Sequence, residues 1–300
     1  MGKKLTIGIV TMNREEQLAE ALYSCLRTDL PDETEFVVID NASTDNTEKV
    51  VKEILENSGY AYYYEKLTEN IGCGRGRNYA FSKSCGTYYF SLDDDAVIDE
   101  QCRNFFTYAI DVLDNNTKIV TLTTQIYDTA WKSDRVEKTS IKIADDLYEC
   151  KMFCGGSHFL RRYFFKTEPY FSNEYGYEEI PPSLYVADAG CKNAFCPTIR
   201  IIHKPKVNKW DHSDEKNQAL LINECVLQYA IKKAVYPRIV APILYAAYKA
   251  RCQRYLKQVS DWKKQADNLL AQTENSTKEL RRIKIKTITD LYCKFGHAIF

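Results

Sequence analysis

The first half of the chain alternates between two hydrophobic periods. Apolar runs of strand length and stretches with helical spacing follow one another in this order: LTIGIVTM (5–12), EEQLAEALYSCL (15–26), FVVIDNAS (36–43), NTEKVVKEILENS (46–58), YAYYYEKL (60–67), a helix near 76–84 and TYYFSL (87–92). Strands separated by helices of this size are typical of α/β proteins in which the sheet is largely parallel. The pattern therefore predicts an α/β fold for this half.

Beyond residue 117 the pattern changes. The runs predicted as strands are KIVTLTTQIYD (118–128), KMFCGGSHFLRR (151–162) and the short TIRIIHK (198–204), and EEIPPSLYVADAG (178–190) is predicted to begin as a loop and continue as a helix. After Asp211 the spacing is mainly helical, with interruptions predicted at Pro237 and Pro242. We therefore predict an α/β domain over residues 1–210 and a mainly helical extension over residues 211–300.

Polar side chains gather where the predicted strands end. Thr11 and Asn13 follow the first strand, Asp40 and Asn41 end the second, and the run Asp93–Asp95 ends a later one. Because the carboxyl ends of parallel strands share one edge of a sheet, and ligands of such folds bind outside that edge, these groups are expected to face one crevice.

Three consecutive aspartates at this edge indicate a cation site. Adjacent carboxylates repel one another, and Mg²⁺ and Mn²⁺ prefer oxygen ligands, frequently one or two carboxylates together with substrate phosphates. Capping of the next helix is the alternative interpretation, but one aspartate is sufficient for a cap. The run Asp93–Asp95 therefore predicts a site for Mn²⁺ or Mg²⁺.

The glycine-rich stretch ENIGCGRGRNYA (69–80) does not match the common nucleotide-binding loops. Its glycines do not complete G-x-G-x-x-G, and it lacks the Gly-Lys-Ser/Thr of a P-loop. Arg75 and Arg77 before a helix are able to contact a phosphate or a base. A loop with two solvated arginines is the simpler alternative.

Four motifs, in this order, resemble the family 2 glycosyltransferases of the GT-A fold: VVIDNASTDNT (37–47), NIGCGRGRN (70–78), SLDDDA (91–96) and GYEEIPPSLYVADAGCKNAFCPTIRIIHK (176–204). The resemblance covers residues 4 to about 204. It implies a nucleotide-diphosphosugar transferase fold, with a Rossmann-like mixed sheet flanked by helices, to which a helical C-terminal extension is attached.

The resemblance also implies a role for individual residues. The nucleotide-sugar-binding set would be Thr11, Asn13, Arg14, Asp40, Asn41, Asn70, Arg75, Arg77, Asp93 and Asp94. Within it, Thr11 and Asp40 match positions that contact the base, usually uracil, and Asp93 matches the ribose contact. Asp95 matches the metal ligand of the DxD motif, and His203 a position that approaches the metal or the diphosphate.

Catalysis is implied for the acidic pair Glu178-Glu179. Family members typically have Glu-Asp here, so Glu179 stands where the aspartate is usual and Glu178 is its close competitor. An inverting transfer needs a base that removes the proton of the attacking hydroxyl, and either carboxylate can serve. The pair is also a favourable acidic helix start before Pro181-Pro182, and the two roles are compatible.

The sequence thus predicts an inverting, metal-dependent glycosyltransferase that moves a sugar from a nucleotide-sugar, expected to be a UDP-sugar, to a glycan, lipid-linked or protein hydroxyl in surface polysaccharide or glycoconjugate synthesis. A sugar nucleotidyltransferase is one alternative, but it would need a glycine-rich loop where this chain has TMNREEQ (11–17). An inactive nucleotide- or glycan-binding module is another, favoured only by the Glu-Glu substitution.

Charge is distributed unevenly along a chain whose formal net charge is zero. The segment from Tyr229 to Phe300 carries a net charge of +10, and residues 236–257 mix aromatic and aliphatic side chains with five lysines and arginines. Such a helix can contact an anionic membrane surface, or it can pack on the α/β domain or on another subunit of a homo-oligomer. Nucleic acid is not an expected partner.

The N-terminal sequence and the cysteines bear on location. Met-Gly-Lys-Lys leads directly into a strand-like run without the pattern of a signal peptide, and the 11 cysteines are scattered and odd in number. We therefore expect reduced thiols and a cytoplasmic location, with the basic helices as candidates for peripheral contact with the inner face of the membrane.

Overall fold

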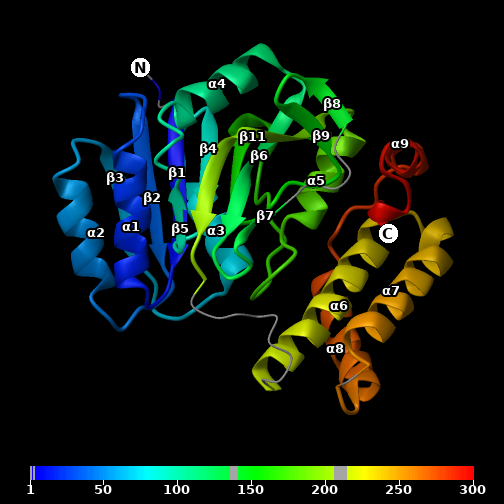
Figure 1. The fold of residues 1–300 in the computed structure, drawn as a ribbon. Coiled ribbons are helices and arrows are strands. Elements are labelled where there is room, and N and C mark those ends of the chain that lie inside the picture. Colours follow the sequence, from blue (N-terminus) through cyan, green and yellow to red (C-terminus); the bar gives the residue numbers. More distant parts are fainter. Residues whose placement is uncertain (1, 3, 136–140, 206–214, 258) are drawn as a thin grey trace.

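The computed structural model describes residues 1–300 except 1, 3, 136–140, 206–214 and 258. One mixed sheet of 11 strands forms the centre of the molecule (Figure 1), in the order β3-β2-β1-β4-β10-β6-β11-β9-β8, with β5 beside β11 and β7 beside β6. The strands are β1 (Leu5–Thr11), β2 (Thr34–Asp40), β3 (Ala61–Lys66), β4 (Tyr88–Leu92), β5 (Ala96–Ile98), β6 (Ile119–Asp128), β7 (Ser133–Arg135), β8 (Ile141–Ala144), β9 (Leu147–Cys150), β10 (Ser157–Arg161) and β11 (Lys192–His203).

Strand direction decides which ends of the strands meet. β3, β2, β1 and β4 are mutually parallel, whereas β10 runs antiparallel to both of its neighbours, β4 and β6. The two reversals across β10 restore the direction, so β6 and its parallel neighbour β11 point the same way as β4. The carboxyl ends of β1, β2, β4, β6 and β11 therefore lie along one edge of the sheet.

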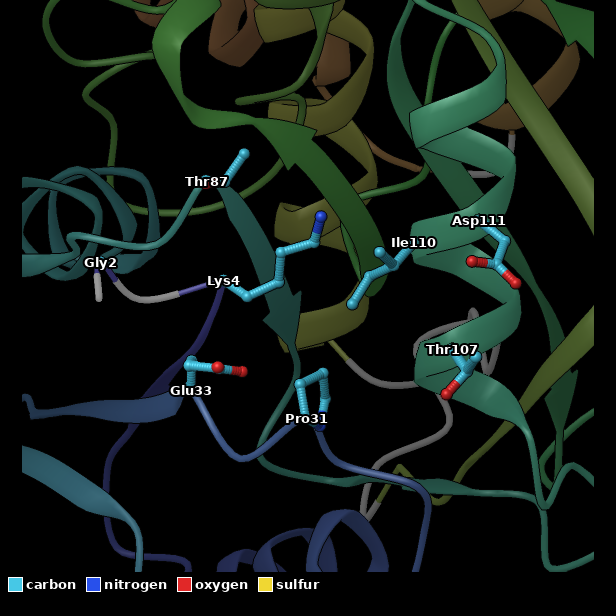
Figure 2. A pocket seen from close by; sticks show the side chains of 8 residues that line it. All are labelled: Gly2, Lys4, Pro31, Glu33, Thr87, Thr107, Ile110 and Asp111. Carbon is cyan, nitrogen blue, oxygen red and sulfur yellow. The ribbon is translucent and has the colours of Figure 1, made fainter.

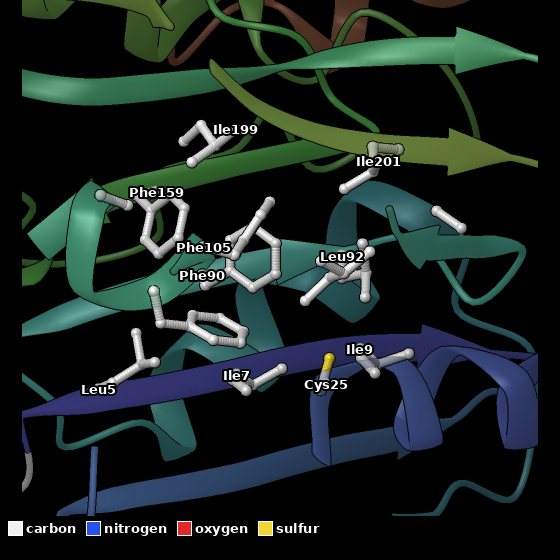
Figure 3. Close-up of a cluster of buried hydrophobic side chains, with 14 of the residues drawn as sticks. Leu5, Ile7, Ile9, Cys25, Phe90, Leu92, Phe105, Phe159, Ile199 and Ile201 are labelled. Atoms are coloured by element: carbon white, nitrogen blue, oxygen red, sulfur yellow. The ribbon is translucent and has the colours of Figure 1, made fainter. Parts of the chain in front are cut away.

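Helices cover both faces of the sheet. They are α1 (Glu15–Leu26), α2 (Thr47–Glu56), α3 (Cys73–Lys83), α4 (Phe105–Asn115) and α5 (Ile180–Asp188). Helices α1, α2 and α4 share the main core with one face, and Figure 3 shows Cys25 of α1 and Phe105 of α4 among strand residues such as Ile7, Phe90 and Phe159. The alternate residues Val37 and Ile39 of β2 point to the other face, which α3 covers through Ala80.

The predicted elements of the first half are confirmed, and the differences lie further along the chain. The predicted strand at 151–162 is a strand only over Ser157–Arg161, because the preceding turn leaves the sheet and binds Thr123 Oγ1 through the backbone N–H of Cys154 at 3.1 Å. The predicted short strand at 198–204 is the second half of β11, whose register shifts between Cys196 and Arg200.

The C-terminal helices are α6 (Glu215–Val235), α7 (Ala241–Tyr255), α8 (Trp262–Ser276) and α9 (Ile285–Phe295), drawn in yellow to red in Figure 1. The prediction that Pro242 interrupts a helix is wrong, because it lies in the first turn of α7, where its missing N–H costs nothing. The boundary predicted at residue 210 lies outside the described residues. None of the described helices is both long and apolar enough to cross a bilayer.

These helices pack on the α/β part through a second core. Its buried residues include Ile180 and Leu184 of α5 together with Val226 and Ile231 of α6. Helix α7 contributes Leu244, Tyr248 and Cys252 to the same core, so one side of the basic segment 236–257 is covered by this chain. Packing on the α/β part is thus observed, and membrane contact stays a prediction.

Asp188 at the end of α5 holds the C-terminal segment by a cluster of hydrogen bonds. Its carboxylate accepts bonds from Arg281 Nη1 at 2.6 Å, from the backbone N–H of Lys284 at 2.8 Å and from Thr287 Oγ1 at 2.6 Å. Burial alone would raise its pKa, but these donors outweigh burial and lower it. The buried carboxylate therefore stays ionised and ties α9 to α5.

Replacing Asp188 by Asn should lower the free energy of unfolding by about 1–3 kcal/mol, since Arg281 loses its ion pair and one acceptor becomes a donor. The measurement is urea unfolding followed by circular dichroism. Asp290→Asn is the matched control, because the Asp290–Lys286 pair is exposed and should contribute less than about 1 kcal/mol. Equal losses in the two variants would contradict the anchoring role.

Candidate active site

Polar side chains from the carboxyl ends of β1, β2, β4 and β11 meet in one cavity of about 860 Å³. Thr11 ends β1, Asp93–Asp95 follow β4, and His203 ends β11. Of the predicted site residues, those that line the cavity are Thr11, Arg14, Asn41, Asn70, Arg77, Asp93, Asp94, Asp95, Glu178, Glu179 and His203. The rule that ligands bind at carboxyl strand ends thus located the cavity from the sequence.

Three predicted site residues, Asn13, Asp40 and Arg75, do not line the cavity. Asp40 is fully buried and accepts hydrogen bonds from Tyr64 Oη at 2.8 Å and from the backbone N–H of Ser43 at 2.7 Å. Asn13 accepts a bond from the backbone N–H of Thr44 at 2.7 Å, and Arg75 donates to the carbonyl of Ile71 at 2.5 Å. In this structure they shape the neighbouring loops, and their binding of a nucleotide stays a prediction.

The three consecutive aspartates are held by arginines from two helices. Arg14, just before α1, bridges Asp94 and Asp95 through Nη1, at 2.8 Å and 2.5 Å. Arg77 on α3 forms ion pairs with both Asp93 and Glu178. The repulsion among the carboxylates is therefore offset by cations of the protein itself.

Burial and neighbouring charge shift the pKa values of the three carboxyl groups in different directions. Burial is the largest influence on Asp94 and raises its pKa to about 6 despite Arg14. Burial alone would also raise the pKa of Asp95, but the hydrogen bond and charge of His203, together with Arg14, lower it to about 2. Burial outweighs Arg77 and raises the pKa of Asp93. Asp95 is thus the carboxylate most firmly held in its ionised form.

His203 lies between two carboxylates. Its Nε2 is 3.3 Å from Asp95 Oδ1, and its Nδ1 is 3.1 Å from Asp128 Oδ2. Burial lowers the pKa of His203, but the hydrogen bond to Asp95 and the nearby acidic charges outweigh burial and raise it. The imidazole is therefore oriented by Asp128, the arrangement commonly found behind histidines that bind metals.

Asp93, Asp95 and His203 fit a divalent cation. One ligand atom from each residue lies within 4.8 Å of the other two. Among the described residues, no other group of three His, Cys, Asp or Glu side chains has this arrangement. Two carboxylate oxygens and one imidazole nitrogen are a donor set that Mn²⁺ accepts. The grouping also gives Asp93, matched to a ribose contact by the sequence, an alternative position as a metal ligand.

The acidic pair at the start of α5 has two different environments. Glu178 is buried and bound to Arg77, although its Oε2 has no hydrogen-bond partner in the described chain. Glu179 lines the cavity and forms no ion pair with a described residue. Burial, followed by the charge of Glu178, raises the pKa of Glu179 to about 8. Glu179 is thus a carboxylate able to take up a proton near neutral pH.

The glycine-rich stretch brings α3 close to the loop before α5. Gly72 has φ +86°, and a Cβ there would lie 2.6 Å from Glu174 Cα. A Cβ on Gly74 would lie 2.2 Å from the carbonyl oxygen of Phe171. These contacts require glycine, and the close approach lets Arg77 reach Glu178. The sequence left a phosphate contact and a solvated loop open for this stretch. Arg77 is buried in the cavity wall, whereas Arg75 is exposed.

The residues of this site that the sequence did not predict include Asp128, Arg135, Tyr177 and Glu224. Asp128 ends β6, so the strand-end rule applied to 118–128 would have found it. Arg135 bonds Asp128 at 2.7 Å and lines the cavity, but β7, which carries it, has only three residues and no hydrophobic pattern. Tyr177 and Glu224 also line the cavity, and Glu224 comes from α6, beyond the predicted catalytic domain.

A second cavity lies at the opposite edge of the sheet. Figure 2 shows it lined by residues such as Lys4, Glu33 and Thr87, which directly precede β1, β2 and β4. Its volume is about 530 Å³, and none of the predicted site residues lines it. The amino ends of the strands therefore do not share in the chemistry described above.

Curated relatives match short parts of the chain. An uncharacterized protein of Haemophilus influenzae is 28% identical over 116 residues, which are 38% of this chain and 62% of that protein. The poly(ribitol-phosphate) β-N-acetylglucosaminyltransferase TarS of Staphylococcus aureus is 30% identical over 99 residues, 33% of this chain and 17% of TarS. Both matches thus span less than two thirds of the relative.

Solved structures share the fold. TarS 1–349 of S. aureus in complex with UDP-GlcNAc superposes with a TM-score of 0.63 at 18% identity and covers 91% of this chain and 81% of that one. The mannosyltransferase PcManGT of Pyrobaculum calidifontis, in complex with GDP-Man and Mn²⁺, has a TM-score of 0.58 at 18% identity and covers 99% and 84%. GalNAc-T7 with UDP, GalNAc and Mn²⁺ also has a TM-score of 0.58, at 15% identity, and covers 78% and 51%.

The family itself is shown by sequence. The model described as Glycosyl transferase family 2 matches residues 6–168, more than half of the chain, and this range contains the glycine-rich stretch and the three aspartates. With its mixed sheet flanked by helices, the chain is a glycosyltransferase of the GT-A fold and belongs to glycosyl transferase family 2.

Proposed function

We propose that this protein is an inverting glycosyltransferase that depends on a divalent cation and moves a sugar from a nucleotide-sugar to a hydroxyl group. The observation that carries the proposal is that Glu179, an unpaired carboxylate with a raised pKa, shares one cavity with the group Asp93, Asp95 and His203. A base and a cation site in one cavity suit transfer between an anionic leaving group and a neutral hydroxyl.

The donor is proposed to be a UDP-sugar. TarS is described with UDP-GlcNAc and GalNAc-T7 with UDP, although PcManGT is described with GDP-Man. Asn41 supports a polar ligand here, since it lines the cavity and its buried Oδ1 has no hydrogen-bond partner in the described chain. Asp93, Asp95 and His203 would hold Mn²⁺ or Mg²⁺, which supplies charge neutralisation for the departing diphosphate.

Glu179 is proposed as the general base, and Glu178 as the residue that positions Arg77. The ion pair with Arg77 occupies one of the oxygens of Glu178, so that oxygen is not free to face an acceptor hydroxyl. Glu179 has no such pair and removes the proton of the acceptor hydroxyl as that oxygen attacks the anomeric carbon. The acceptor is proposed to be a glycan, a lipid-linked sugar or a protein in surface polysaccharide or glycoconjugate synthesis.

The direct test is to incubate the protein with Mn²⁺ and a panel of nucleotide sugars and to follow release of the nucleoside diphosphate. Release that depends on both the metal and an acceptor is expected. Formation of pyrophosphate from a nucleoside triphosphate and a sugar phosphate would instead indicate a nucleotidyltransferase. Donor binding without turnover across a broad acceptor panel would indicate a binding module.

Asp95→Asn should weaken Mn²⁺ binding by about 100-fold or more, because loss of a ligand costs at least as much as loss of its outer partners. UDP affinity should then no longer depend on Mn²⁺, as measured by isothermal titration calorimetry. Asp134→Asn is the control, since Asp134 is half-exposed, pairs with Arg200 and does not line the cavity. Metal-dependent UDP binding that survives in Asp95→Asn would exclude Asp95 as a ligand.

Glu179→Gln should reduce kcat by about 10²–10⁴-fold while donor affinity stays within a factor of two, because only the proton acceptor is removed. Steady-state kinetics and calorimetry with UDP provide the two readouts. Glu178→Gln should weaken donor affinity as well, since Arg77 loses a partner. The assignment is wrong if Glu179→Gln retains full turnover.

The rate should rise with pH through the region around 8 and level off above it. Glu179 acts as a base only when deprotonated, and its raised pKa of about 8 leaves about one molecule in ten deprotonated at pH 7. A profile of kcat/KM between pH 5.5 and 9.5 should therefore show an ascending limb with a midpoint near 8, and the limb should be absent from the residual activity of Glu179→Gln. A limb that is unchanged in this variant would assign the titration to another group.

A further inference from the structure

A third cavity lies between α5 and the C-terminal helices. Its volume is about 290 Å³, and it is lined by Lys151, Met152, Ile180, Ser183, Leu184, Gln228, Lys232, Tyr236, Arg251, Leu291, Ala298, Ile299 and Phe300. The residues come from the turn after β9, from α5, α6, α7 and α9, and from the segment that follows α9. We call it the interhelical cavity.

Three of its side chains are cations and none is a carboxylate. Within the described residues, Lys151, Lys232 and Arg251 form no ion pair with an acidic side chain. Nearby cations are paired, as Arg281 is with Asp188 and Lys294 is with Glu149. Phe300 brings an α-carboxyl group to the same lining, but among the described residues no carboxylate lies within ion-pair distance of the three cations, and like charges in a medium of low dielectric repel strongly.

Lys232 shows the strain of this arrangement most directly. Burial, followed by the charges of Arg251 and Lys151, lowers the pKa of Lys232 to about 7. Gln228, one turn earlier on α6, has a buried Oε1 without a hydrogen-bond partner in the described chain.

We propose that the interhelical cavity is a binding site for a phosphoryl group. Lys151, Lys232 and Arg251 would surround its oxygens, because a guanidinium and two ammonium groups are the side chains that recognise phosphate, and the amide of Gln228 adds a further polar contact. The apolar remainder of the wall excludes water and strengthens each of these contacts.

The position of the cavity identifies the acceptor as the source of that group. Glu224, Gln228 and Lys232 are spaced by four residues and form one stripe along α6, which runs from the active-site cavity at Glu224 to the interhelical cavity at Lys232. Eight residues of helix span about 12 Å. Resting on the proposed glycosyl transfer, the inference is that the acceptor carries a phosphate about this far from its reacting hydroxyl.

The first test measures phosphate binding while the donor site is filled. With UDP and Mg²⁺ at saturation, inorganic phosphate and glycerol 3-phosphate should raise the Tm of the wild type, since a ligand that binds the folded state stabilises it. In Lys232→Met and Arg251→Gln the rise should be lost, and the affinity measured by calorimetry should fall at least ten-fold. Lys249→Met and Arg254→Gln, which alter exposed cations of α7 outside the cavity, should keep the full rise.

Two results would overturn the site. One is a phosphate-induced shift that survives in both Lys232→Met and Arg251→Gln, and the other is complete competition between UDP and phosphate in the wild type. Either result leaves UDP binding intact, so it is distinguishable from failure of the proposed function, in which UDP and Mg²⁺ themselves do not bind.

The second test addresses the source of the phosphate. Glycerophosphoglycerol, a phosphodiester that carries free hydroxyls, should stimulate UDP release from a UDP-sugar more than glycerol at equal concentration. Lys232→Met should raise KM for the phosphodiester at least ten-fold and leave KM for the donor unchanged. Equal stimulation by the two compounds, together with phosphate binding in the first test, would overturn the acceptor as source and indicate a site for free phosphate.

Discussion

Three adjacent carboxylates at the end of a buried strand are the constraint on which the active site depends. Asp93, Asp94 and Asp95 cannot be tolerated there without positive charge. Arg14 supplies it from the start of α1 and Arg77 from the first turns of α3, on opposite faces of the sheet. The two helices therefore have to begin where they do, and the short loops after β1 and β3 fix that position.

The same need explains why distant segments converge. Arg77 also binds Glu178, so the ion pair that neutralises Asp93 fixes the loop before α5 at the same time. The glycines of α3 permit that loop to approach the helix, and on its other side the loop leads into α5, which carries the C-terminal helices. One buried guanidinium thus connects the donor side of the cavity, the candidate base and the packing of the last third of the chain.

The sequence predicted the location of the site better than its detail, for a physical reason. Strand ends are visible as a change from apolar to polar residues, so the sequence alone places Thr11, Asn41 and Asp93–Asp95 at one edge, whereas His203 is assigned through the family resemblance. Asp128, the last residue of β6, carries the same signal. Which carboxylate pairs with which arginine depends on the approach of α3 to residues 171–178, and no local pattern encodes a contact over 101 positions of separation such as Arg77–Glu178. Glu224 was missed for a related reason, since its side chain reaches the cavity only because α6 packs on α5.

The uneven charge of the chain acquires a structural meaning from the two cavities. In the active-site cavity carboxylates outnumber cations, and the cations present are engaged with them: Arg14, Arg77, Arg135 and His203 each contact an aspartate or a glutamate. In the interhelical cavity the relation is reversed, since no acidic side chain accompanies Lys151, Lys232 and Arg251 in the lining. Two of these three cations belong to the C-terminal segment whose excess positive charge is evident from sequence. Most of that excess is solvated on helix surfaces, where it contributes little. The cations enclosed in the interhelical cavity are different, because a charge that is removed from water and left unpaired lowers the stability of the fold. A bound anion would offset that loss. An acidic cavity that would hold a cation and a basic cavity that would hold an anion lie along one face of α6, so the two proposed ligands would be recognised through opposite charges.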